Sequence, residues 1–404
     1  MRRAGICLGG LLFLACGPAT ASDPHQPYIP SADAIVLEHL PSRGDPRVRA
    51  FDALRQRRLA APRNSGLAIQ LARSYLDYGR ATGDARYLGR AQAVIAPLLA
   101  QRNPPVDALL LQATLLQSRH QFVASRQLLQ AVLRRDPDNS EAWLTLSAVA
   151  LVQGDMREAQ RDCMHLLTQA DALVAAGCIA ARDTVTGHAR EALAVLDALA
   201  PQALGAPASE RAWLHGLMAD AARYRGDVAR ADREYPIALT LAPGDNFLIA
   251  DYADFLLDED RPREALVLTR DYPQSDTSFL RQVLAERALG LPQAGADAAT
   301  MASRFTDLER RGDRRLYARE AARFALTVQH APGLALQLAR DDWSFQRAPE
   351  DVRVLLEAAL AAGAPAQARP ALEFLAATGL EEPEVRALAR RLEAALHAAQ
   401  ERRP

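Results

Sequence analysis

The strongest constraint on this sequence is that it repeats its own pattern at a spacing of about 34 residues. A glycine followed five positions later by an alanine recurs at Gly154–Ala159, Gly187–Ala192 and Gly226–Ala231. A repeat of this length is typical of a small unit of supersecondary structure that can bury its apolar face only against its neighbours. The chain is therefore expected to fold as a stack of similar units.

Length and composition agree with a helical stack. At 404 residues the chain is long for a single compact core. Aromatic residues make up only 5% of it, alanine and leucine are abundant, and glycine and proline separate the apolar runs. This balance favours helices over strands. The sequence predicts an all-α fold.

The unit that begins at Ser140 resembles a tetratricopeptide repeat (TPR). Trp143 and Leu146 would fill its first helix, Gly154 would make the turn, and the small side chain of Ala159 would let the second helix approach the first. The resemblance covers residues 64–380 and is weakest over 275–349. It implies a right-handed superhelical solenoid of antiparallel helix pairs. The chain is also similar to exported repeat proteins of proteobacteria.

The regions that flank the repeats have separate roles. Residues 1–21 have the basic start, short apolar run and small-residue ending of a signal peptide, with cleavage expected after Ala21. The alternative is a lipoprotein acylated at Cys16. Residues 22–63 are expected to form an extended segment and a leading helix, and residues 381–404 a capping helix with charged side chains. No later run is long and apolar enough to span a membrane. We expect a periplasmic protein.

Two cysteines remain after removal of the signal peptide. The resemblance places Cys163 and Cys178 on neighbouring helices of successive units. A disulfide between them would close a loop of about 15 residues and would contribute about 3 kcal/mol. The alternative is a pair of buried, unpaired thiols. Because disulfides persist in exported proteins, we expect the bond to form.

The sequence gives little indication of catalysis. The net charge is −1 and all 48 basic residues are arginine, so no strong positive field would attract nucleic acid. No phosphate-binding loop, nucleophile elbow or Cys-x-x-Cys motif occurs. Cys163 and His165 are two positions apart on a predicted helix and would face different directions. We expect no enzymatic activity, no cofactor and no metal site.

In TPR proteins the first helices of successive units line a concave groove, so the resemblance also implies a set of groove-facing positions. The candidate partner-binding residues are Arg73, Asp77, Glu141, Trp213, Asp220, Arg223, Tyr224, Asp254 and Asp258. The same matching places Asp107, Thr114, Gln117, Leu144, Ala148, Gly216 and Phe247 on this face.

Two features of this face have alternative explanations. Trp213, Arg223 and Tyr224 could form an aromatic and cationic patch, or Trp213 could pack beneath the loop at residues 201–207. The carboxylates of Asp254 and neighbouring residues could form an acidic wall for a basic ligand, or a solvated face. A clamp for a partner's C-terminal carboxylate needs lysines, which are absent from this chain.

The function expected from this pattern is that of a non-catalytic scaffold or adaptor in the cell envelope, which holds a segment of a partner protein in its groove. The alternative is an outer-membrane-associated component that assembles or exports polysaccharide, or that belongs to a secretion machinery. The sequence does not predict the partner or the oligomeric state.

Overall fold

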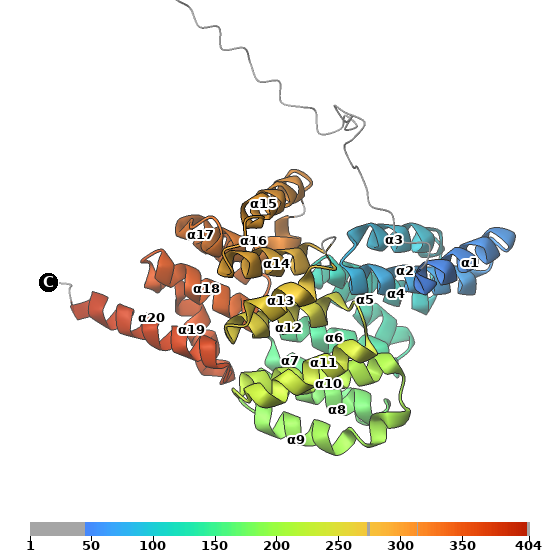
Figure 1. Ribbon diagram of the computed structural model, residues 1–404. Coiled ribbons are helices and arrows are strands. Elements are labelled where there is room, and N and C mark those ends of the chain that lie inside the picture. The colour runs from blue at the N-terminus through green and yellow to red at the C-terminus, as the bar shows by residue number, and fades with distance from the viewer. Residues whose placement is uncertain (1–44, 273–274, 313, 402–404) are drawn as a thin grey trace, which may run out of the picture. The chain divides into compact units, whose positions relative to one another are not determined.

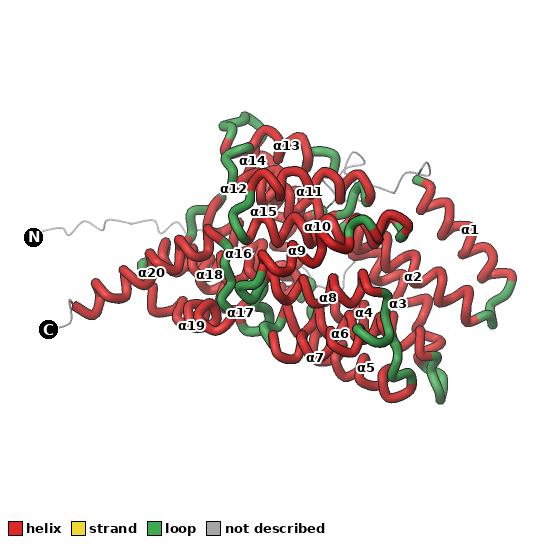
Figure 2. Tube along the Cα trace, turned by 90° about the horizontal axis from the view of Figure 1, so that it is seen from below, coloured by secondary structure: helices red, strands yellow, loops and turns green. Residues whose placement is uncertain are grey.

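The computed structural model describes residues 45–272, 275–312 and 314–401. These belong to one compact unit, residues 42–404. The expected signal peptide at 1–21 lies outside the described residues, as does most of the expected extended segment. Within the described part every regular element is helical and no strand occurs, which confirms the all-α prediction (Figure 2).

Among the residues that the structure describes, nine pairs of consecutive helices follow one another (Figure 1). The first five are α2 (Ser65–Thr82) with α3 (Ala85–Leu99), α4 (Val106–Ser118) with α5 (Phe122–Arg135), α6 (Ser140–Val152) with α7 (Met156–Leu166), α8 (Ala172–Thr184) with α9 (Ala189–Leu199), and α10 (Ala208–Tyr224) with α11 (Val228–Leu241). The last four are α12 (Asn246–Asp258) with α13 (Pro262–Thr269), α14 (Asp276–Ala288) with α15 (Ala294–Arg310), α16 (Ala318–Thr327) with α17 (Pro332–Trp343), and α18 (Pro349–Ala361) with α19 (Arg369–Thr378).

Two single helices flank the pairs. Helix α1 (Pro46–Ala60) packs on α2 and coincides with the leading helix expected from the sequence. Helix α20 (Pro383–Glu401) packs on α18. Short 3₁₀ helices lie in three of the connections, as η1 (Gln202–Gly205), η2 (Arg314–Tyr317) and η3 (Pro365–Ala368).

The Gly-Asp pairs of the sequence form the turns within units. Gly154 has φ of 78°, in the left-handed region that a side chain would disfavour. The carboxylate of Asp155 then accepts a hydrogen bond from the backbone N–H of Glu158 at 3.0 Å, which caps α7. One glycine therefore ends the first helix, and the aspartate after it starts the second.

Small residues let the two helices of a pair approach closely. Ala159 and Ala192 are 0% and 1% exposed, which confirms their predicted place at the crossing of the two helices. In the preceding unit the Ser125 hydroxyl donates a hydrogen bond to the backbone oxygen of Ala113 across the same crossing, at 2.8 Å. Larger side chains here would separate the helices and expose the apolar stripe that holds the stack together.

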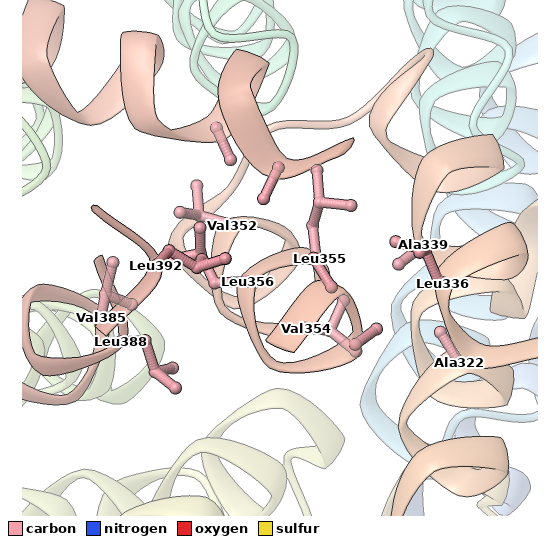
Figure 3. Packing of buried hydrophobic residues seen from close by; sticks show 14 of the residues in the cluster. Ala322, Leu336, Ala339, Val352, Val354, Leu355, Leu356, Val385, Leu388 and Leu392 are labelled. Carbon is pink, nitrogen blue, oxygen red and sulfur yellow. The ribbon is translucent and has the colours of Figure 1, made fainter. Parts of the chain in front are cut away.

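The C-terminal helix is attached to the stack by its apolar face. Val385, Leu388 and Leu392 of α20 are buried in one cluster with Val352 and Leu356 of α18 (Figure 3). The opposite face of α20 remains charged and exposed at Arg390, Arg391 and Glu393. The helix therefore covers the last apolar face of the stack with a polar surface, as an end cap must.

Turns of the early units lie against later parts of the chain, and we call this line of contacts the seam. Its contacts join Gly83 to Ser275, His120 to Arg315, Gly154 to Arg347 and Phe374, Gly187 to Gly379, and Gly226 to Pro383. At one point the backbone N–H of Arg347 donates to the backbone oxygen of Val152 at 2.7 Å. The first five units are thus packed against the last ones, and the stack is not held by neighbour contacts alone.

Cys163 of α7 and Cys178 of α8 form a disulfide, with their Cα atoms 5.6 Å apart. Both cysteines are buried between successive units. The bond therefore links the third helix pair to the fourth, at the contact on which the stacking of these two units depends.

We expect the purified protein to contain this bond. Trypsin cleavage after Arg161 and Arg182 leaves both cysteines in a single peptide, residues 162–182. Without reductant, mass spectrometry should find this peptide about 2 Da lighter than its reduced form, and alkylation should add nothing to it. A peptide that carries two alkyl groups without prior reduction would contradict the disulfide.

Candidate binding groove

A pocket with a volume of about 330 Å³ opens on the face formed by the first helices of the first five pairs. Every lining residue belongs to α2, α4, α6, α8 or α10. We call it the groove pocket, and the residues that define it here are Arg80, Gln117, Glu141, Leu144, Ala148 and Trp213. Of the twelve lining residues, six had been assigned to the groove from the sequence: Thr114, Gln117, Glu141, Leu144, Ala148 and Trp213.

Trp213 forms part of the pocket wall. Its indole lies across Gly177 of α8, where an added Cβ would overlap the ring. The glycine therefore lets the indole lie against the helix, with one side partly open to the pocket. Arg223 and Tyr224, the other members of the expected aromatic and cationic patch, do not line this pocket.

An ion pair bridges the pocket rim. Arg73 of α2 donates from Nη1 to both carboxylate oxygens of Glu141 of α6, at 3.0 Å. Both side chains are about 40% exposed, so the pair adds little to stability, but it occupies both charges. Asp77, one turn further along α2, has its pKa raised by burial, while Arg73 and Arg80 oppose the shift.

The other five candidate residues lie elsewhere, against the chain's own C-terminal helices. Asp254 of α12 accepts hydrogen bonds from Arg281 of α14 at 2.6 Å and from Arg323 of α16 at 2.6 Å. Asp258 accepts two from Arg353 of α18, each 2.8 Å long. We call these two carboxylates and their arginines the inner ionic cluster: Arg223, Asp254, Asp258, Arg281, Arg323 and Arg353.

This cluster changes the interpretation of the acidic wall. The Asp254 and Asp258 carboxylates are neutralised by arginines of the same chain, so they do not present negative charge to a partner. Arg223 pairs with Asp258 at 2.9 Å, and the Tyr224 hydroxyl donates to Glu350 of α18 at 3.0 Å. In this conformation these side chains join units of the solenoid, and the open part of the concave face is the groove pocket.

Burial and the charge of nearby arginines act in opposite directions on the pKa of two carboxyls, Asp254 of the cluster and Asp220 outside it. Burial by itself would raise the pKa of Asp254, but Arg281 and Arg323 outweigh it and hold that pKa well below its ordinary range. Burial raises the pKa of Asp220 to about 6, although the Tyr235 hydroxyl donates to it at 2.9 Å and the charge of Arg223 opposes the shift.

Three arginines of the cluster, Arg281, Arg323 and Arg353, were not among the residues selected from the sequence, whereas Arg223 was. The repeat match is weak over 275–349, where Arg281 and Arg323 lie, so no groove positions could be transferred there. A usable signal was present: Arg281, Arg323 and Arg353 each lie near the middle of the first helix of a later unit, which is a groove-facing helix. Their pairing with Asp254 and Asp258 required the three-dimensional structure.

The described residues contain neither a metal-binding cluster nor a membrane-spanning helix. Within the described ranges, no group of three or more His, Cys, Asp or Glu side chains is arranged to hold a metal ion. No helix among these residues has the length and apolar character needed to cross a membrane.

No protein-family model and no curated protein matches the sequence. The fold resembles solved helical structures. A chain of the APC/C hetero-tetramer Cut9-Hcn1 is 14% identical with a TM-score of 0.51, and the match covers 86% of this chain and 66% of that one, slightly less than two thirds. The human IFIT1 dimer with m7Gppp-AAAA is 14% identical with a TM-score of 0.43, over 87% of this chain and 86% of that one.

The P58(IPK) TPR domain is 15% identical with a TM-score of 0.24, over 82% of this chain and 99% of that domain. Only the first similarity exceeds a TM-score of 0.5, and at 14% identity it concerns the fold alone. Together with the nine helix pairs, it identifies a TPR-like helical solenoid.

Proposed function

We propose that this protein is a non-catalytic adaptor that binds a polypeptide segment of a partner protein in the groove pocket. The observation that carries the proposal is the make-up of this pocket. First helices of five successive units line it, Leu144, Ala148 and Trp213 give it an apolar floor, and Arg80 and Glu141 lie at its edge. A long concave surface with an apolar floor and polar rim suits an extended polypeptide.

We place this activity in the cell envelope. The signal-peptide pattern of residues 1–21 supports export, with a mature N-terminus at Ser22. The disulfide between Cys163 and Cys178 suits an oxidising compartment, because such bonds are rare in cytosolic proteins. The partner is then an envelope protein or an exposed segment of one.

The substitution Ala148→Arg tests this function. Ala148 lines the groove pocket, and a long charged side chain there should fill it without disturbing the helix, since arginine is a good helix former. In-cell crosslinking of the tagged protein, followed by affinity capture and mass spectrometry, should yield a dominant envelope partner. We expect this partner to be lost with Ala148→Arg.

Ala194→Arg is the matched control, because Ala194 is exposed on α9, the second helix of its pair. Both variants should unfold at the temperature of the parent protein. Equal capture of the partner by all three proteins would contradict binding in the groove pocket.

A further inference from the structure

A second pocket adjoins the groove pocket and shares two of its lining residues, Arg80 and Gln117. It has a volume of about 300 Å³ and lies where the ends of α2 and α4 meet the starts of α12 and α14. We call it the junction pocket. Its apolar lining includes Phe122 and Phe247, and Phe247 is 56% exposed. The two pockets therefore form one groove with apolar surface at both ends.

The two shared residues differ from the polar groups around them. Neither the Arg80 guanidinium nor the Gln117 amide has a hydrogen-bond or ion-pair partner among the described residues. Of the neighbouring charges, Glu141 binds Arg73, Asp276 binds Arg304 at 2.9 Å, and Arg319 binds Asp351 at 3.3 Å. Asp77 interacts electrostatically with both Arg73 and Arg80.

The hydroxyl groups of the groove pocket are also in use. Thr114 and Thr145 donate to backbone oxygens one turn earlier in their own helices, at 3.1 and 2.7 Å. Ser147 donates to the backbone oxygen of Ala159. In the groove pocket, the polar groups left for a ligand are therefore those of Arg80 and Gln117, the two residues that also line the junction pocket.

We propose that the bound segment is an extended polypeptide that carries an acidic side chain between two apolar ones. This rests on the proposed function above. The acidic side chain pairs with Arg80, and the neighbouring peptide group bonds the Gln117 amide. One apolar side chain packs against Trp213 in the groove pocket and the other against Phe247 in the junction pocket.

Charge and shape select this occupant over other anions. A nucleic acid presents a row of phosphates and needs several free cations, whereas this groove offers one. A small free anion would use Arg80 but would leave the apolar surfaces at both ends uncovered. A polypeptide matches all three parts, because apolar contacts, a charged group and peptide hydrogen bonds occur together along one chain.

The test begins with selection of peptides that bind the full chain from a phage-displayed random library. The selected peptides should share an acidic residue flanked by apolar residues. Fluorescence anisotropy of one labelled peptide should then show about tenfold weaker binding to Arg80→Gln, since a charge-assisted hydrogen bond is lost. The same peptide with glutamine in place of its acid should bind the parent protein and Arg80→Gln equally weakly.

Arg190→Gln is the matched control, because Arg190 is exposed on the outer helix α9 and the charge change is the same. Selected peptides that lack an acid, or that bind Arg80→Gln as well as the parent, would overturn this inference. If those peptides nevertheless bind the Ala148→Arg variant more weakly than the parent protein, the proposed function stands. If no peptide is selected, or if Ala148→Arg binds all of them normally, both proposals fail.

Discussion

Replacement of Asp254 by alanine is expected to lower the free energy of unfolding by about 3 kcal/mol, because it removes one of the two carboxylate partners of the buried Arg281, which then keeps only Glu320. Asp254 is 5% exposed and Arg281 is 3% exposed, so water cannot take over the lost interaction. Arg323 loses its partner in the same step. Urea unfolding of the parent protein and the variant would measure the difference.

Glu264→Ala is the control for this prediction. Glu264 pairs with Arg261 at 2.7 Å, as close as the pairs of Asp254, but its side chain is 57% exposed. Water should replace that interaction, so we expect almost no change in the free energy of unfolding. A loss of the same size in both variants would mean that burial does not decide the strength of these pairs.

The contribution of Asp254 to the free energy of unfolding should also depend on pH. Its pKa in the folded protein is lowered from the ordinary value of 3.8 because Arg281 and Arg323 outweigh the effect of burial. A carboxyl with a lowered pKa contributes its stability at pH values above the unfolded pKa, and the contribution is lost as the pH falls towards the folded pKa. The difference between parent and variant should therefore be constant down to about pH 4 and shrink below it.

The second large effect is expected for Gly187→Ala at the seam, with a loss of about 3 kcal/mol. Gly187 has φ of 75°, and an ideal Cβ on it would lie 2.7 Å from the carbonyl oxygen of Gly379. The nearest neighbour is backbone and cannot rotate away, so the seam must open or shift. Urea unfolding gives the loss, and hydrogen exchange should show faster exchange around Gly379.

Gly363→Ala separates the two causes of this loss. Gly363 also has positive φ, 63°, but nothing lies within 4 Å of its ideal Cβ. The variant should therefore show only the strain of the left-handed conformation, about 1 kcal/mol. An equal loss for both glycines would indicate that the seam does not constrain Gly187.

Local features of the fold could be predicted because they depend on short stretches of sequence. Gly154 was expected to make the turn between two helices, and it does so with positive φ, while Asp155 after it accepts a hydrogen bond from the backbone N–H of Glu158. Ala159 was expected at the helix crossing and is fully buried. These features depend on residues within one or two units, so the 34-residue pattern is enough to predict the helix ends and the helix crossing.

The candidate site was only partly predictable for the same reason. Glu141, Ala148 and Trp213 share a pocket because each lies on the first helix of a unit, at a position that the resemblance assigns to the groove. Arg80 was missed because its unit has a longer turn and a longer first helix than the pattern, so the position could not be matched.

The sequence by itself thus determined the repeating helix pairs, their turns and the proximity of neighbouring units. Only the tertiary structure decided which distant units meet. Asp258 and Arg353 are 95 residues apart in sequence and Tyr224 and Glu350 are 126 apart, yet both pairs form hydrogen bonds. The physical reason is that each unit adds a small rotation to the one before, and these rotations accumulate over many units. The sum of these rotations determines which early and late units meet at the seam, and no single stretch of the sequence encodes that sum.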